Sequence, residues 1–421
     1  MAQYIAKRVR FRNGERVSVL KAPNGLPVHE VTLYVDKYRR KGRAANTIHG
    51  VCRALALLYR ELASKKVDLF ARLSAGEFLT IPEMDRLASA AQYRVDDLDD
   101  EDDVEDNPAV INLARIRFRR HAREAPTRRA VDVETQATRL RYMADFLEFA
   151  VNYVSSTLTS AARAELKATS ERALTVFRAN IPKDSKRSKL NARVGLSTEE
   201  MDRLLAVVKV DSPDNPWVHE FVRRRNWLII VLLLATGMRR GELLGLQVGD
   251  LAPNQPKLRI VRRADTTSDA RLKQANTKTG DREIELRPAI MKALWAFIRS
   301  ERYAIKAARK IPQIFVSDEG QALSESSVDK LFADLRAACP GLPMRLTSHV
   351  TRHTWNDRFS EQAEALGLSD AVEEKARNAQ QGWADNSAMA ATYTRRHTAR
   401  KGREVALKLQ ERLDESLKQD K

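Results

Sequence analysis

The chain has 421 residues, 43% of them hydrophobic and 31% charged, and its formal net charge is +18. This length is typical of two or three domains, and the hydrophobic fraction excludes wholesale disorder. The positive excess favours a polyanion as partner, with a basic surface kept only for solubility as the alternative.

Cysteine content and hydropathy exclude further classes of protein. Cys52 and Cys339 lie far apart in the sequence, which argues against a disulfide framework and a cysteine-based zinc site and fits a reducing cytoplasm. The most apolar run, at 227–235, is too short to span a bilayer. It therefore predicts a buried helix, and we expect no membrane partner.

The first part of the chain changes from β-like to helical patterns. Residues 1–28 have short β-like stretches around Asn-Gly turns and are treated as an N-terminal extension. Residues 29–185 are predicted to form a helical domain. In it, NTIHGVCRALALLYRELASK has a plausible cap at Asn46, and VETQATRLRYMADFLEFAVNYV is strongly amphipathic.

The helical domain contains an acidic insertion at 96–106, with nine acidic residues in eleven positions. Such a block is typical of a solvated, mobile loop, and the alternative is a mimic of DNA charge that covers a basic groove. The arginines that follow it predict a phosphate-contacting surface, with a solvated helix face as the alternative. These predicted DNA-binding residues are Arg115, Arg117, Arg119, Arg120, Arg128 and Arg129.

A polar, basic linker at 186–196 is predicted to lead into a second domain at 197–421. Ser197 and Glu200 have the spacing of a capping box. Further elements are predicted as helices at 198–208 and 288–309 and as strands at 257–264, 282–287 and 314–317. The expected fold class is α-rich and multidomain: a helical domain, then a mostly α (α+β) domain with a small antiparallel sheet.

The stretch SHVTRHTW, at 348–355, places His349 and His353 one helical turn apart. A zinc protease would need a glutamate where Val350 stands, and Arg352 would oppose a bound dication. We therefore predict no metal site here. Arginine presents a planar fork of donors that fits phosphate, so the stretch favours phosphate handling instead.

Four motifs follow one another in the second half: ATGMRRGELLGL, TKTGDREIEL, HVTRH and QGWADNSAMAATYTRR. In this order they resemble the tyrosine recombinase (phage integrase) family over about 190–400. Trp383 stands where most members have histidine and some have tryptophan. Lys278 matches the lysine of the family's β-hairpin, and Lys273 is the alternative. The match gives a predicted catalytic set of Arg239, Lys278, His349, Arg352, Trp383 and Tyr393, with Glu242 and His353 in supporting positions.

The resemblance implies a covalent reaction at a DNA phosphodiester. Tyr393 would attack phosphorus and form a 3′-phosphotyrosine, while Arg239 and Arg352 stabilise charge on the non-bridging oxygens. Lys278 would protonate the departing 5′ oxygen, and His349 would take the tyrosine proton or bind the transition state.

The remaining implications concern the tryptophan and the energetics. Trp383 can donate only its indole N–H, so it would hold a phosphate oxygen without moving a proton. No metal or other cofactor is expected, because the covalent link conserves the energy of the phosphodiester for religation.

The resemblance also implies a biological role. The protein would be a site-specific DNA recombinase that integrates and excises a mobile genetic element in the bacterial cytoplasm, at the nucleoid. Residues 29–185 would be its core-binding domain. Expected partners are double-stranded DNA with specific recombination sites and a homo-tetramer assembled on it through the C-terminal tail helix, with an accessory directionality factor or sister recombinase as further candidates. The alternatives are a type IB topoisomerase-like or hairpin-resolving enzyme and a catalytically silent DNA-binding regulator.

Deletion of 96–106 distinguishes the two interpretations of the acidic insertion. A charge mimic over a basic groove predicts that the deletion tightens non-specific DNA binding and steepens its dependence on salt. A solvated loop predicts unchanged affinity and salt slope. Fluorescence anisotropy with a random-sequence duplex at several salt concentrations measures both quantities, and an exchange of the nine acids for Asn and Gln controls for loop length.

Overall fold

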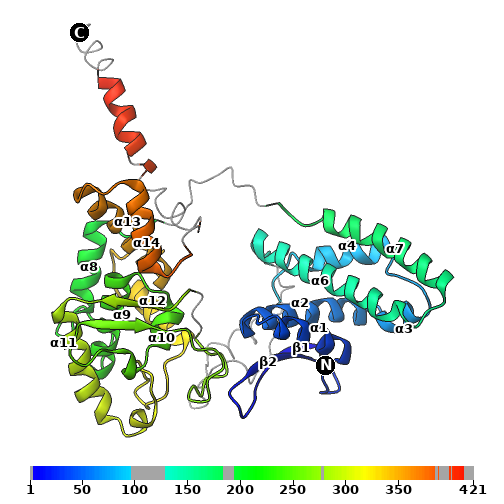
Figure 1. Cartoon of the computed structure of the whole chain (residues 1–421), viewed down its shortest axis with the longest axis horizontal. Helices are drawn as coiled ribbons and strands as arrows, with labels where there is room; N and C mark the ends of the chain where they lie inside the picture. The colour runs from blue at the N-terminus through cyan, green and yellow to red at the C-terminus, as the bar shows by residue number, and fades with distance from the viewer. Residues whose placement is uncertain are drawn as a thin grey trace. The chain divides into compact units, whose positions relative to one another are not determined.

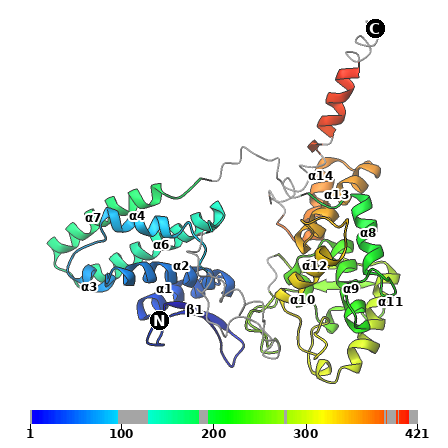
Figure 2. The ribbon, with the colours of Figure 1, turned by 180° about the vertical axis from the view of Figure 1, so that it is seen from behind.

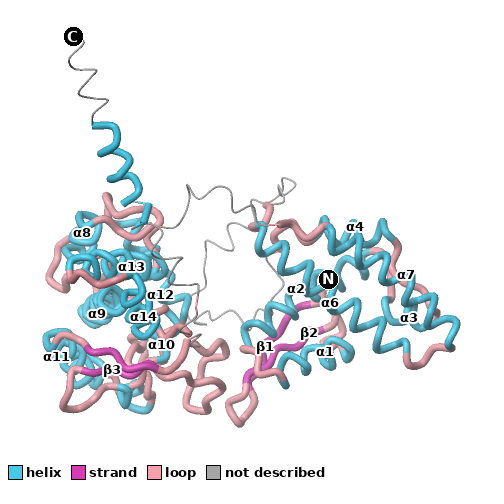
Figure 3. The backbone as a smooth tube through the Cα atoms, turned by 45° about the horizontal axis from the view of Figure 1, so that its top comes forward, coloured by secondary structure: helices cyan, strands magenta, loops and turns pink. Residues whose placement is uncertain are grey.

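The computed structural model describes residues 3–95, 129–183, 194–275, 279–384, 387, 398–399 and 401–411. The chain divides into two compact units, Met1–Lys189 and Leu190–Lys421 (Figure 1), and each has its own hydrophobic core. Helices dominate both units, and the sheets found among the described residues are two small antiparallel pairs (Figure 3). The predicted α-rich fold class is confirmed.

In the first unit, a central helix contacts most of the other elements. Helix α2 packs against the hairpin, α1, α4 and α6 (Figure 2). Ala6 and Leu20 of the hairpin are fully buried in the same core, so residues 1–28 pack onto the helices. The elements are β1 (Ile5–Arg10), β2 (Arg16–Lys21), α1 (His29–Arg40), α2 (Ala45–Ser64), α3 (Leu69–Ser74), α4 (Ile81–Ala90), α6 (Val133–Ser155) and α7 (Ser160–Ala179).

Two helix predictions in this unit have different outcomes. The amphipathic stretch predicted from its periodicity is α6, whose apolar face is buried. The cap predicted at Asn46 is wrong, because α2 already begins at Ala45 and Ala44 holds the cap position without a side-chain bond. Asn46 therefore lies inside the first turn, where its side chain is not needed to start the helix.

The second unit is organised around α9 (Glu220–Thr236), which contacts α8, α10, α11 and α13. The apolar run at 227–235 belongs to this helix, and Leu228, Ile229 and Leu233 are fully buried, as predicted. None of the helices that the structure describes is both long and apolar enough to cross a membrane. The other elements are α8 (Thr198–Val208), α10 (Arg240–Gly245), β3 (Lys257–Ile260), β4 (Arg282–Glu285), α11 (Pro288–Phe297), α12 (Glu325–Ala338), α13 (Ser348–Ala365) and α14 (Asp370–Gln381).

The predicted boundaries in this unit are partly corrected. Helix α8 has the predicted capping box of Ser197 and Glu200. Strands β3 and β4 are shorter than predicted, because beyond Ile260 the chain turns to side-chain contacts such as Arg262 N to Asp281 Oδ1, 2.6 Å. The strand predicted at 314–317 is only an isolated bridge at Val316, and the helix predicted at 288–309 gives way after Phe297 to a π turn.

The start of the second unit is fastened to α13. Leu196 N donates to Thr354 Oγ1 at 2.8 Å, and Gly195 N donates to Asp357 Oδ2 at 3.2 Å. A Cβ at Gly195 would lie 2.7 Å from the Cα of Thr354, so glycine is required for this close approach. These contacts fix the helix that carries His349 and Arg352.

We expect Gly195→Ala to destabilise the second unit by about 1–3 kcal/mol, since the backbone of α13 must shift to admit the methyl group. All five tryptophans of the chain lie between 217 and 383. Tryptophan fluorescence during urea unfolding therefore follows this unit alone. The control is Gly249→Ala, whose Cβ would meet nothing within 4 Å; equal midpoints for the two variants would contradict the steric argument.

Candidate active site

The site is built around a tight turn at the end of α9. Gly237 ends the helix in the left-handed conformation, with φ 62°. A Cβ there would lie 2.7 Å from Cδ2 of Trp355, so both the conformation and the space require glycine. Two residues later Arg239 stands at the cap position of α10, and the turn thus sets where this arginine leaves the core.

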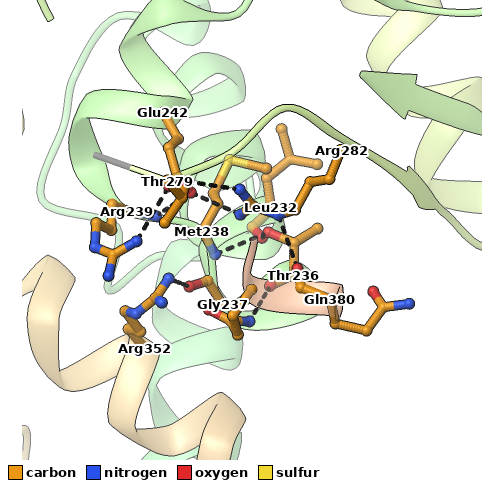
Figure 4. A network of polar contacts seen from close by, with 11 residues as sticks. Leu232, Thr236, Gly237, Met238, Arg239, Glu242, Thr279, Arg282, Arg352 and Gln380 are labelled. Atoms are coloured by element: carbon orange, nitrogen blue, oxygen red, sulfur yellow. Dashed lines mark hydrogen bonds and ion pairs between the residues drawn. The ribbon is translucent and has the colours of Figure 1, made fainter. Parts of the chain in front are cut away.

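The last carbonyl groups of α9 are bound by side chains from α13 and α14. The final C=O groups of a helix have no intrahelical partners and need donors from elsewhere. Here each of three consecutive carbonyls receives one donor, which locks both helices onto the turn. Figure 4 shows the bond that brings Arg352 to the segment of Arg239. The bonds are Trp355 Nε1 to Ala235 O, 3.1 Å, Gln381 Nε2 to Thr236 O, 3.2 Å, and Arg352 Nη1 to Gly237 O, 2.6 Å.

Arg239 is held by the buried carboxylate of Glu242. Its backbone N–H donates to Oε2 at 3.0 Å, and its Nη1 donates to Oε1 at 3.3 Å. Glu242 is 1% exposed, whereas the side chain of Arg239 is 26% exposed. The ion pair therefore orients a guanidinium that solvent, or a ligand, still reaches.

Glu242 also binds the segment that leads into β4. Thr279 Oγ1 donates to its Oε1 at 2.7 Å, and Arg282 Nη2 donates to its Oε2 at 2.8 Å. Burial alone would raise the pKa of the Glu242 carboxyl. The Arg282 guanidinium and the hydrogen bonds outweigh burial, so this pKa lies below its usual value and the group is an anion at neutral pH.

Arg352 and Trp383 lie against each other. Arg352 is 1% exposed, and its Cζ lies 5.2 Å from the centroid of the indole ring, a cation–π contact. Trp383 follows Gly382, the left-handed residue that ends α14, and Gly382 O accepts from Gly280 N at 3.1 Å. The end of α14, the segment before β4 and α13 are thereby brought to one place.

The two histidines of α13 are stacked edge to face. The ring centroids of His349 and His353 are 4.6 Å apart, with an interplanar angle of 83°. His349 is exposed and His353 is half-buried. This arrangement leaves His349 accessible from outside, while His353 supports its ring.

The other predicted residues are placed only in part. The predicted residues Lys278, Tyr393, Arg115, Arg117, Arg119, Arg120 and Arg128 lie outside the described residues. Arg129 is exposed, and its carbonyl accepts from Arg94 N at 2.8 Å. Lys273, the alternative hairpin lysine, forms an ion pair with Glu325 of α12 at 2.6 Å. In the part of the chain that is described, no group of three His, Cys, Asp or Glu side chains could hold a metal ion.

Sequence reasoning missed several residues of this network, among them Arg282, Trp355 and Gln381. A signal for Arg282 exists. Arg282 has the same parity as Ile284 of β4 and as Leu286 just after the strand, which are both buried, so it lies on the apolar face of the strand. An arginine in that position needs a buried acid, and Glu242 is that acid.

The lowered pKa of Glu242 predicts how stability depends on pH. Its contribution is complete above the unfolded value of about 4.3 and is lost as pH falls through the lower folded value. We expect Glu242→Gln to reduce the free energy of unfolding by roughly 3–5 kcal/mol at pH 7. The difference from wild type should shrink as pH falls from about 5 to 3.

Tryptophan fluorescence in urea at several pH values measures this difference. The control is Glu283→Gln, which removes an exposed ion pair with Lys257 and should leave the urea midpoint nearly unchanged at any pH. A wild-type advantage that stays constant from pH 7 to pH 3 would contradict the assignment.

Comparison with known proteins agrees with the motifs. The phage integrase family matches residues 196–399. No curated protein matches the chain. Three solved structures are similar at low identity: XerA recombinase (16% identity, 87% of this chain and 92% of that chain, TM-score 0.35), XerH site-specific recombinase bound to palindromic difH substrate (15%, 78% and 84%, 0.41) and the Tn1549 transposon integrase in complex with circular intermediate DNA (18%, 67% and 92%, 0.37).

The family assignment rests on the match over 196–399, which contains Arg239, Glu242, the two histidines and Arg352. It confirms the resemblance found from the four motifs. Residues 196–399 therefore form a domain of the phage integrase family.

Proposed function

We propose that the protein cleaves and rejoins DNA strands through a 3′-phosphotyrosine formed on Tyr393, and that it integrates and excises a mobile genetic element. One observation carries the chemical part of the proposal. Within a domain of the family, the guanidinium of Arg352 is bonded to the turn that carries Arg239, and Trp383 lies against it.

This arrangement suits the charge that develops during attack on a phosphodiester. The phenolic oxygen forms a bond to phosphorus while the bond to the 5′ oxygen breaks, and negative charge accumulates on the non-bridging oxygens. Donors fixed before the reaction stabilise that charge without reorganisation, and the loss of one such donor typically costs ~10²–10³ in rate. Arg239, oriented by Glu242 and still accessible, is suited to this role.

The protons are assigned to other residues. His349, exposed at the start of α13, takes the proton of the Tyr393 hydroxyl or binds the transition state. Lys278 gives a proton to the departing 5′ oxygen, and Trp383 donates its indole N–H to a phosphate oxygen. The reverse sequence rejoins a strand, since the phosphotyrosine keeps the energy of the broken bond.

The partners follow from charge and from the C-terminal region. A net charge of +18 suits double-stranded DNA, with specific recombination sites and a tetramer as the assembly. Residues 401–411 are helical and expose Val405, Leu407 and Leu409, which suits docking on a neighbouring subunit. The core-binding role of 29–185, the arginine contacts from Arg115 to Arg129, an accessory directionality factor or sister recombinase, and action at the bacterial nucleoid belong to the same proposal.

A nicked suicide duplex carrying the native site tests the proposal. Wild type should give a denaturant-resistant protein–DNA adduct, and Tyr393→Phe should give none. The control is Tyr303→Phe, which removes an exposed hydroxyl of the same domain and should cleave like wild type.

Three outcomes would contradict the proposal. An adduct with Tyr393→Phe would mean that the nucleophile is another residue. No adduct with wild type would favour a silent DNA-binding regulator. Relaxation of a supercoiled plasmid without any site requirement would favour a type IB topoisomerase-like enzyme.

A further inference from the structure

We propose that Arg282 is a positioning residue of the cleavage site, holding Arg239 through Glu242 and the segment before Trp383 through Gln380. This inference rests on the proposed function. The side chain of Arg282 is 5% exposed, so it acts through its neighbours and not by touching DNA.

Three donors of Arg282 reach three separate parts of the unit (Figure 4). Nη2 donates to Glu242 Oε2 on α10 at 2.8 Å, and Nη1 donates to Thr279 Oγ1 at 3.0 Å. Nε donates to the carbonyl of Gln380 on α14 at 2.8 Å. Only the rigid fork of a guanidinium supplies three donors in these directions, so lysine is not an equivalent replacement.

The contact of Arg282 with Glu242 determines how far Glu242 neutralises the positive charge of Arg239. Glu242 Oε2 accepts from both Arg282 Nη2 and the backbone N–H of Arg239, and Oε1 accepts from Arg239 Nη1. One carboxylate is thus shared by two guanidinium groups, with a formal sum of 2 − 1 = +1. Without Arg282 the carboxylate would neutralise Arg239 alone and hold it more tightly, away from a phosphate.

The contact with Gln380 fixes the other side of the site. Gly280 N donates to Gly382 O, and a Cβ at Gly382 would come within 2.9 Å of Gly280 O. Arg282, the first residue of β4, adds its bond in the last turn of α14, so the start of this strand and the segment before it are each tied to the helix end. Trp383 follows directly, with Arg352 over its ring.

The first experiment measures single-turnover cleavage of the suicide duplex at saturating DNA. We expect Arg282→Gln to lower the cleavage rate by about 10- to 100-fold, because small misplacements of catalytic groups cost up to about that much. The dissociation constant for the same duplex should change by less than about threefold, since Arg282 does not reach DNA. Arg282→Lys should remain closer to the Gln variant than to wild type.

A matched control separates positioning from folding. Arg302 is also a buried arginine, and it donates to backbone carbonyls of Ala308 and Gln313 away from the site. Arg302→Gln should lower the melting temperature and leave the cleavage rate unchanged at temperatures where each variant is folded. A rate loss in Arg302→Gln as large as that in Arg282→Gln would overturn the proposal.

A substrate with an uncharged group at the cleavage position distinguishes a positioning role of Arg282 from a purely structural one. A methylphosphonate at the cleavage position carries no negative charge, so it needs less help from Arg239. The factor by which Arg239→Ala or Arg282→Gln lowers the cleavage rate relative to wild type should be smaller on this substrate. An Arg282→Gln loss that is equal on both substrates, or a variant that cleaves like wild type, would overturn the inference while the proposed function stands. Absence of any adduct with wild type would overturn both.

Discussion

The site depends on one carboxylate that has been removed from water. Glu242 is almost completely buried, and an ion in that position is tolerated only where donors surround it. Its two oxygens accept from Arg239, Thr279 and Arg282, which come from the turn after α9 and from the segment leading into β4. The need to satisfy this anion therefore draws two distant stretches of chain together and orients the accessible arginine.

Helix α9 connects this network to the hydrophobic core of the second unit. Its middle is buried on several sides by its neighbours, and its final carbonyls are bound by Arg352, Trp355 and Gln381. Because the helix end needs external donors, α13 and α14 cannot shift against it without leaving buried carbonyls unsatisfied. The positions of Arg352 and Gln381 are thus set by the end of α9, which also begins the turn that carries Arg239.

Local patterns in the sequence predicted much of the fold but little of this network. Periodicity predicted α6 and the buried α9, and the capping box predicted the start of α8, because these depend on residues a few positions apart. The cap at Asn46 was wrong, because α2 already begins at Ala45 without a side-chain cap. The order of the motifs indicated Arg239 and Arg352 as catalytic residues, and these roles stay predictions. Their connection through Gly237 joins positions 115 residues apart, which periodicity and propensity do not register.

Arg239, Arg282 and Arg352 differ in how far they are buried, which indicates different roles. Arg282 and Arg352 are buried and donate to acceptors of the protein, whereas Arg239 is partly exposed. With Glu242, their formal charges sum to 3 − 1 = +2 in one network. Cations in one network repel each other. The shared carboxylate holds Arg239 and Arg282, and the hydrophobic core around α9 keeps the elements that carry all three in place. Folding therefore establishes the positive field before any anion arrives, which is the condition under which fixed donors stabilise developing charge most strongly.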